Sequence, residues 1–526
     1  MQLSTAELEV AFLVMVVPLV YILGKCILKS WATSLFREIP IVGFRDGLLS
    51  RAQATCRSLW KTAEWAAEGY AKFSKHNSPY LISTLDRGLV VLLPVIQMKT
   101  VYRLPEDRLD IFGTLNEQIQ AKYTIRNQKV IRDPYHRHLI PSELDIFTEP
   151  MVNELEKGLE SLWGTETGWR EIPIWQSCFQ LVARATNYAL CGIPLCRDEN
   201  YLKYLQVQST AVFGGSMLIS ITPKPLRMFT GRLVRWWCLY YSRKINSICA
   251  PYIGKRIDET IHMKDGNNSG TGCPKDGLQL IIDETTSRGE PLAVGVIAER
   301  LLIANNVSIH STTLTVHNLI MSLVTSDPSS GYIEALREEC RDVLSSAGGI
   351  WTLDAVRKLK LVDSAIRESM RVFPFASVAM ARTVVDPQGI SIEHGDSSVH
   401  VPQGTTLALP MESIHYDEDT YPDASRFNPF RFTSEDTGST TAKPTTTADD
   451  KFLSFGTSRN PCPGRFLAVH EMKLIVASML LNYDIEYTKT KLDFTNLLAM
   501  KVPNTGITLR VRRRPDLKEH YRPSPT

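Results

Sequence analysis

One cysteine in a rigid loop constrains this chain more than any other feature. Cys462 stands between two prolines in the run FGTSRNPCPGR, residues 455–465. Residues 466–481 are strongly apolar with helical spacing, so the cysteine precedes a helix N-terminus. Loop N–H groups and the positive end of the helix dipole both stabilise a thiolate, so we expect the pKa of Cys462 to be lowered. A thiolate placed in this way is a candidate ligand for haem iron.

The same run resembles the haem-binding signature of the cytochromes P-450, which reads Phe, two residues, Gly, several residues, Cys, one residue, Gly. Its continuation PGRFLA, residues 463–468, is similar to filamentous-fungal members of the family. The resemblance implies haem b (iron protoporphyrin IX) as cofactor, with Cys462 as the axial iron ligand. The residues implied at the cofactor are Phe455, Gly456, Cys462, Gly464, Arg465 and Arg382. The alternative, a buried thiol without a ligand, is disfavoured by the length and rigid spacing of the pattern.

The resemblance also implies a mainly α fold with a small β subdomain over essentially the whole chain. Helical patterns cover 144–162, 297–323, 331–344 and 356–372, and strand-like runs cover 88–95 and 505–511. Two segments are expected to be linker-like. The Gly/Asn/Ser-rich stretch 264–276 suits an exposed connection, and the Thr-rich stretch 433–450 before the cysteine loop is expected to be a flexible surface insertion.

The first residues predict a membrane anchor. Residues 10–28 are apolar apart from Lys25, about 19 residues against the roughly 20 that cross a bilayer. A cleaved signal peptide is the alternative, but Glu7 and Glu9 precede the run and no small-residue cleavage site follows. Lys29 and Arg37 lie after the span, which predicts a cytosolic catalytic domain. We therefore predict a single transmembrane helix within 1–36, a catalytic domain at 37–526, and an endoplasmic reticulum membrane location.

Charge and cysteine spacing argue against a nucleic-acid-binding protein and against a zinc-binding or disulfide-bonded one. A net charge of +3 is too small for nucleic acid to be the main partner. The ten cysteines show neither CxxC pairs nor zinc spacing, and scattered thiols suit a reducing compartment.

A stretch at 224–244 mixes arginines with tryptophans and tyrosines. Basic and aromatic side chains together suit a lipid headgroup region. An ordinary amphipathic helix with its aromatic side chains packed inward is an equal alternative from the sequence.

Three charged residues resemble a structural cluster of the family. Glu368 and Arg371 share one helix face at i and i+3, which in isolation would be a near-neutral surface pair. The resemblance implies that Arg431, in the later run PFRF, joins them in a buried ion cluster that is structural and not catalytic.

The segment that delivers protons to bound oxygen in the family differs here from the family pattern. Where the family carries an acidic residue and then a threonine, this chain has His310 and Ser311, followed by Thr312. Histidine titrates near neutrality and hydroxyls can donate to an oxygen species, so the set implies proton delivery. The alternative for His310 is a purely structural hydrogen-bonding role. Arg132 and His136 match propionate-contacting positions only loosely, and a surface role is the alternative for both.

The resemblance further places three segments at the distal pocket, 301–308, 373–380 and 498–504. Their side chains Leu302, Ile303, Phe375, Val378, Met500 and Val502 are apolar, which suits a hydrophobic substrate.

These features together indicate a membrane-anchored haem-thiolate monooxygenase. It would insert one oxygen atom from O2 into a hydrophobic secondary metabolite of the terpenoid, polyketide or alkaloid kind. The implied electron donor is an NADPH–cytochrome reductase, with or without cytochrome b5. Two alternatives stay open: a haem-thiolate isomerase or peroxygenase that needs no reductase, and a non-catalytic haem-binding sensor. The substrate and the oxidised position do not follow from the sequence.

Overall fold

The computed structural model describes residues 38–44, 50–125, 143–264, 273–433, 443–490 and 492–515. The predicted anchor at 1–36 lies outside them. The helices are α2 (Ser50–Lys72), α3 (Val95–Val101), α4 (Phe112–Gln118), α5 (Ala121–Thr124), α8 (Asp145–Trp163), α9 (Ile174–Cys191), α10 (Glu199–Ile221), α11 (Arg227–Lys264), α12 (Gly277–Ser287), α13 (Val294–Thr325), α14 (Tyr332–Ser346), α15 (Leu353–Lys358), α16 (Lys360–Val372), α17 (Met411–His415) and α18 (Arg465–Asn482).

The strands form small separate sheets. They are β1 (Ile41–Val42), β2 (Tyr80–Thr84), β3 (Gly88–Leu92), β4 (Leu109–Asp110), β5 (Arg170–Pro173), β6 (Ala379–Val384), β7 (Ile390–His394), β8 (Ser397–Val401), β9 (Thr406–Leu409), β10 (Tyr483–Ile485), β11 (Phe494–Leu497), β12 (Met500–Pro503) and β13 (Thr508–Arg513). The largest sheet has the order β1-β2-β3-β9-β6-β4, and the others are β10-β13-β5, β11-β12 and β7-β8.

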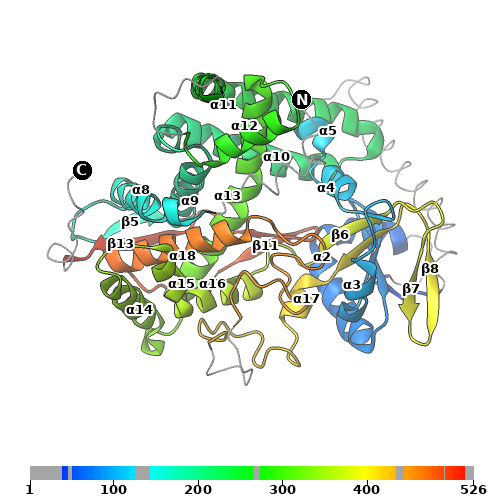
Figure 1. Ribbon diagram of the computed structural model, residues 1–526. Coiled ribbons are helices and arrows are strands. Elements are labelled where there is room, and N and C mark those ends of the chain that lie inside the picture. Colours follow the sequence, from blue (N-terminus) through cyan, green and yellow to red (C-terminus); the bar gives the residue numbers. More distant parts are fainter. Residues whose placement is uncertain are drawn as a thin grey trace, which may run out of the picture.

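The long helix α13 runs through the middle of the helical region, with α18 nearby and α10, α11 and α12 above it (Figure 1). Its 32 residues include Leu301, Ile309 and Leu319, which are almost fully buried in one large apolar cluster. Leu181 of α9 and Leu474 of α18 belong to the same cluster. A helix that is apolar on most of its faces must be surrounded by others, and α13 is the axis of this part of the fold.

The six-stranded sheet lies at one side, next to the β7–β8 hairpin (Figure 1). Alternate residues of β2 belong to different apolar clusters, as the period of two requires. Ile82 clusters with Trp65 of α2, whereas Leu81 clusters with Met98 of α3. The sheet is therefore covered by helices on both faces, and this explains why all five residues of β2 are buried.

The structure confirms the mainly α fold with small β sheets. The helical pattern at 356–372, however, is divided into α15 and α16, because Leu359 leaves the helical conformation (φ −68°, ψ 87°). The carboxylate of Glu339 accepts hydrogen bonds from the N–H groups of Lys360 (2.6 Å), Leu361 (2.7 Å) and Val362 (3.0 Å). These contacts cap the first turn of α16, and a helix running through Leu359 would leave no free N–H groups for them.

The two stretches predicted to be linker-like lie only partly within the described residues. Residues 265–272 and 434–442 lie outside them. The described part of the second stretch is docked, contrary to the prediction. The Thr445 side chain is fully buried, and its N–H donates to Asp363 Oδ2 at 2.8 Å.

Within the described ranges, no helix is long and apolar enough to span a bilayer.

Candidate functional site

The cysteine loop closes back on itself before α18 begins. The Cys462 N–H donates to the Phe455 carbonyl at 2.7 Å. Gly456 has φ +72°, a left-handed conformation that favours glycine, and it turns the chain into the loop. Gly464 is the residue before α18, and the N–H groups of Gly464 and Arg465 are directed at the Cys462 thiol. The loop thus presents one thiol at a helix N-terminus.

The expected lowering of the Cys462 pKa is wrong for the protein alone. Desolvation by the surrounding protein raises the pKa of this thiol, and it outweighs the N–H groups of Gly464 and Arg465 and the Arg465 charge, which all lower it. The residue keeps exposed surface even though protein atoms surround its sulfur. A bound metal cation reverses this balance, because a coordinating thiol loses its proton.

The side chain of Arg465 stabilises the cysteine loop through three contacts. Its Nη1 donates to the Cys462 carbonyl at 2.8 Å and its Nε to the Thr446 carbonyl at 3.1 Å. Its guanidinium lies over the Phe466 ring, 4.4 Å from the centroid. All three contacts hold the polypeptide around the thiol.

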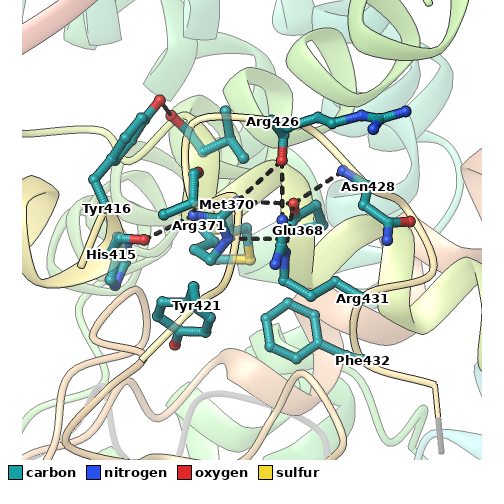
Figure 2. A network of polar contacts seen from close by, with 12 residues as sticks. Glu368, Met370, Arg371, His415, Tyr416, Tyr421, Arg426, Asn428, Arg431 and Phe432 are labelled. Atoms are coloured by element: carbon teal, nitrogen blue, oxygen red, sulfur yellow. Dashed lines mark hydrogen bonds and ion pairs between the residues drawn. The ribbon is translucent and has the colours of Figure 1, made fainter. Parts of the chain in front are cut away.

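Glu368, Arg371 and Arg431 meet in one buried cluster (Figure 2). Arg371 donates from Nε to Glu368 Oε2 at 2.7 Å and from Nη2 to Oε1 at 2.8 Å. Arg431 Nε lies 3.0 Å from Oε1, and the Asn428 N–H also donates to that oxygen at 3.0 Å. The carboxylate is fully buried, so it depends on these donors for charge compensation.

The cluster is linked to the cysteine loop through His415, a residue that the sequence did not single out. Arg371 Nη1 donates to the His415 carbonyl at 2.7 Å, and the His415 Nε2 accepts the N–H of Leu453 at 2.9 Å. Leu453 lies just ahead of Phe455 in the chain. Burial lowers the pKa of His415 to about 3, so its ring is neutral and can serve as this acceptor.

A second buried contact, also missed from the sequence, fixes the segment ahead of the loop. The Arg367 guanidinium lies against the rings of both Phe432 (4.8 Å) and Phe452 (4.0 Å). It donates to the Pro444 carbonyl at 3.0 Å and to Asp449 Oδ2 at 3.3 Å. The signal available in the sequence was the spacing of charges at 363, 367 and 371, which places them on one face of α16.

The middle of α13 carries an accessible strip. Val307 is 63% exposed and Ser311 is exposed one turn later, whereas the neighbouring Asn306 and Thr312 are buried. Thr312 Oγ1 donates to the Ser308 carbonyl at 2.9 Å, so its hydroxyl is directed at its own helix. Of the three predicted distal residues, Ser311 is thus the one that lies on the strip.

His310 lies beside the strip, between two aromatic rings. The ring centroids of Phe179 and Phe213 are 5.4 and 5.2 Å from that of His310, both edge-to-face. Burial lowers the pKa of His310 to about 4, so the imidazole is neutral at pH 7. Its Nε2 is buried without a hydrogen-bond partner among the described residues.

Arg382 is a buried guanidinium that donates to a backbone carbonyl and not to a carboxylate. It is 7% exposed, and Nη1 donates to the Ala381 carbonyl at 3.0 Å. Its guanidinium stacks over the Tyr102 ring at 5.1 Å, and burial lowers its pKa. Within the described part of the chain it forms no ion pair, although the charges of Glu106 and Asp110 act on it from a distance, so it is suited to an anionic ligand. Arg132 and His136 lie outside the described residues.

The two later pocket segments lie side by side. The Ser377 N–H donates to the Ala499 carbonyl at 2.7 Å, and the Lys501 N–H donates to the Phe375 carbonyl at 3.2 Å. Phe375 is 38% and Val502 41% exposed. The other four predicted pocket side chains are buried (Leu302, Val378) or partly buried (Ile303, Met500).

These residues fit haem. Cys462 offers one thiol at a helix N-terminus, and Arg382 offers a buried cation without a carboxylate partner. The accessible strip at Val307 and Ser311 leaves open surface on a helix that is otherwise buried. Cys462 would hold the iron and Arg382 one of the two propionates.

Comparison with known proteins agrees with this geometry. Residues 127–509 match the family described as Cytochrome P450. The chain is 37% identical over 505 residues to cytochrome P450 monooxygenase okaG of Penicillium ochrochloron, covering 90% of this chain and 94% of that one. It is 30% identical to cytochrome P450 monooxygenase htyF of Aspergillus rugulosus, covering 95% and 76%.

The fold is similar to that in the crystal structure of the cytochrome P450DA heme domain. The TM-score is 0.65 at 17% identity, covering 90% of this chain and 98% of that one. The chain belongs to the cytochrome P450 family, and it is a monooxygenase with haem b as its cofactor.

Proposed function

We propose that this enzyme is anchored in the endoplasmic reticulum membrane and oxidises a hydrophobic secondary metabolite. A terpenoid, a polyketide or an alkaloid is the substrate class, and an NADPH–cytochrome reductase supplies the electrons, with or without cytochrome b5. The similarity to fungal monooxygenases supports this proposal.

The observation that carries the substrate class is the apolar character of the accessible side chains. Val307 is 63%, Phe375 38% and Val502 41% exposed, although each belongs to a segment that the family resemblance assigns to the pocket. Apolar surface of this kind gains free energy when a hydrophobic molecule covers it, at roughly 25 cal/mol per Å².

When bound, haem supplies the oxygen chemistry, and the Cys462 thiolate donates electron density to its iron. Residues of the chain itself position the cysteine loop and move protons. The Glu368 cluster and the Arg367 contact hold the cysteine loop in place. Ser311 on the accessible strip can donate a proton from its hydroxyl, and neutral His310 can accept a proton on one ring nitrogen while donating from the other.

A surface on α11 supports contact with a membrane. Phe229 is 62%, Leu233 66% and Trp236 67% exposed, so these side chains do not pack inward. Arg232 and Lys244 are exposed on the same helix, and Lys224 is exposed just before it. Aromatic and basic side chains together match an anionic headgroup layer. This favours the headgroup interpretation of 224–244 over an ordinary amphipathic helix.

The activity is tested by expressing the full chain with a fungal NADPH–cytochrome reductase in yeast fed with fungal terpenoid, polyketide and alkaloid extracts. We expect a compound heavier by one oxygen atom, and none from Cys462→Ala. Product formed with peroxide and without reductase would favour the peroxygenase. Purified haem protein whose iron spin state responds to no extract would favour the sensor.

The membrane proposal is tested with a chain lacking residues 1–36. We expect it to sediment with vesicles that contain phosphatidylserine, and expect the Phe229→Ser/Leu233→Ser/Trp236→Ser variant to stay in the supernatant. Trp60→Ser is the matched control, since Trp60 is 53% exposed on α2. Equal binding by the triple variant would contradict a role for α11.

A further inference from the structure

The hairpin β11–β12 is hydrogen-bonded to two other parts of the chain. Its turn residue Leu498 has φ +56°, and the Leu498 N–H donates to the Leu59 carbonyl of α2 at 2.6 Å. Met500 of β12 forms an isolated antiparallel bridge with Ala376. The hairpin therefore connects α2 with the segment 373–380, which carries accessible apolar surface at Phe375.

Ser377 joins this hairpin to a third element, α17. The Ser377 N–H donates to the Ala499 carbonyl at 2.7 Å, and its hydroxyl donates to the same carbonyl at 3.2 Å. The Ser377 carbonyl accepts the N–H of Glu412, in the first turn of α17, at 3.2 Å. Ser377 is buried, so water does not compete for these hydrogen bonds.

An ion pair joins the hairpin to α17 a second time. Lys501 Nζ of β12 donates to the Glu412 carboxylate, and the two side chains are 11% and 23% exposed. A partly buried pair is screened by salt much less than a surface pair. The Lys501 ammonium also lies over the Phe494 ring, 5.4 Å from its centroid. That ring stacks on Phe373 at 5.3 Å, so Lys501 lies where β11, β12 and α17 approach the segment 373–380.

The Lys501 side chain and the apolar side chains of β12 lie on opposite faces of the strand. Successive residues of a strand alternate between its two faces, so Met500 and Val502 share the face away from Lys501. Val502 is 41% exposed, and Phe375, whose carbonyl accepts the Lys501 N–H at 3.2 Å, is 38% exposed. The ion pair thus holds β12 from behind, and it leaves the accessible apolar side chains free to contact a ligand.

We propose that Lys501 and Glu412 are positioning residues that determine substrate selectivity, by fixing Val502 relative to Phe375. In a well-oriented site, a displacement of about 1 Å can change a rate up to about a hundredfold. The inference takes only one element from the proposed function, namely that the substrate covers Phe375 and Val502. It does not depend on whether the substrate is a terpenoid, a polyketide or an alkaloid.

The test measures the affinity of two azoles for the purified full-chain haem protein, from the shift of the Soret band. Clotrimazole is a bulky apolar azole that binds haem iron and reaches the surrounding side chains, whereas imidazole is too small to do so. Lys501→Met keeps the length of the side chain and removes its charge. We expect it to weaken clotrimazole binding by about tenfold and to leave imidazole binding within about twofold of the parent.

A double-mutant cycle shows whether the two residues act as a pair. Glu412→Gln keeps the N–H that donates to Ser377 and removes the charge that pairs with Lys501. We expect Glu412→Gln to weaken clotrimazole binding by a factor similar to that of Lys501→Met, and the double variant to bind no more weakly than either single one. Losses that multiply in the double variant would mean that the two residues act separately, and would overturn the proposal.

The matched control is Arg256→Met, which removes a similarly buried ion pair elsewhere. Arg256 of α11 and Asp276 lie 2.9 Å apart, and their side chains are 13% and 4% exposed. We expect Arg256→Met to lower the thermal midpoint and to bind both azoles as the parent does. Weaker clotrimazole binding by Arg256→Met would show that any loss of stability has this effect, and would overturn the proposal.

Two further results would also overturn it. One is unchanged clotrimazole binding by Lys501→Met. The other is an equal loss of imidazole binding, because the haem itself would then be disturbed. If Lys501→Met does not accumulate, Glu412→Gln is measured with the same two azoles. The expected pattern in a protein that oxidises none of the fungal extracts would support the inference while contradicting the proposed function.

Discussion

Arg371 and Glu368 form a bidentate ion pair in which neither side chain has any exposed surface, with N–O distances of 2.7 and 2.8 Å. Arg371 also donates to the His415 carbonyl, and His415 accepts the Leu453 N–H. The pair therefore acts on the cysteine loop through a chain of buried hydrogen bonds, and not through contact with the thiol.

Removal of one partner of this pair should abolish haem binding. Glu368→Ala or Arg371→Ala leaves an uncompensated buried charge, at a cost of roughly 3–5 kcal/mol. We expect protein without a Soret band, or no folded protein, as measured by absorbance and gel filtration. Arg357→Ala is the control, because Arg357 and Asp354 form an exposed pair on α15 and its loss costs under about 1 kcal/mol. Soluble, haem-loaded Glu368→Ala would refute the prediction.

The contact between Asp449 and Arg367 should protect thiolate ligation. Asp449→Asn keeps an Oδ1 for the N–H groups of Lys451 and Phe452 but removes the charge beside Arg367. A hydrogen bond to a charged group is worth about 1.5–3 kcal/mol, so the loop loosens. We expect the red-shifted Soret band of the reduced carbonyl complex to be lost at a lower temperature than in the parent.

Lys443→Ala serves as its control, since Lys443 pairs with the same carboxylate at 3.3 Å but is 52% exposed. Equal thermal loss of the band in Asp449→Asn and Lys443→Ala would show that the buried contact has no special role.

Substitution of His310 should lower the share of NADPH electrons recovered in product more than it lowers the stability of the fold. His310→Phe keeps an aromatic ring between Phe179 and Phe213 but removes both ring nitrogens. If the imidazole relays protons, the share of NADPH electrons recovered in product falls about tenfold or more. Because the pKa of His310 is lowered to about 4, this share stays level in the parent between pH 6 and 8. Unchanged coupling in His310→Phe would leave the residue a structural role.

The sequence predicted those parts of the site that depend on short, rigid patterns. The turn at Gly456 and the start of α18 after Gly464 follow from local backbone preferences, and so do the long helices with apolar repeats. Contacts between distant polar residues were not predictable in this way. Thr445 and Asp363 are 82 residues apart, and a threonine-rich segment has the composition of a solvated loop until a buried carboxylate binds it.

The pKa of Cys462 and the helix break at Leu359 both depend on tertiary contacts. The dipole and N–H groups near the thiol were visible in the sequence, but the desolvation that raises its pKa depends on the folded surroundings. The break at Leu359 has no Gly or Pro, since it arises from Glu339 of another helix capping α16.

The close approach of α2 to β2 gives a prediction about stability. A Cβ atom at Gly69 would lie 2.0–2.6 Å from the Tyr80 ring, which is fully buried and donates its hydroxyl to the Ala66 carbonyl at 2.7 Å. The ring cannot move without breaking that bond, so Gly69→Ala should destabilise the fold by about 1–3 kcal/mol in chemical denaturation. Gly214→Ala on α10, where nothing lies within 4 Å, should be neutral or stabilising by up to about 1 kcal/mol. Equal stability of the two variants would contradict the tight packing.

Glu471 on α18 should make stability fall with rising pH. Burial raises the pKa of Glu471 to about 8, and its partner is the hydroxyl of Thr186, at 2.8 Å from Oε1. An unfolded glutamate titrates near 4.3, so between about pH 4.3 and 8 the folded state holds a proton that the unfolded state has lost. Its stabilising contribution is thus full below pH 4.3 and is lost as the pH rises through 8.

Glu471→Gln removes this titration and keeps an acceptor for Thr186. We expect its free energy of unfolding to exceed that of the parent most clearly at pH 8, by on the order of 4 kcal/mol at most. The difference in free energy of unfolding between Glu471→Gln and the parent should decrease towards pH 5, as measured by urea unfolding between pH 5 and 8. Glu486→Gln, at a 42% exposed position on the surface, should follow the parent curve. A constant difference between Glu471→Gln and the parent at every pH would show that Glu471 does not titrate in this window, because only a proton held unequally by the folded and unfolded states can change the slope.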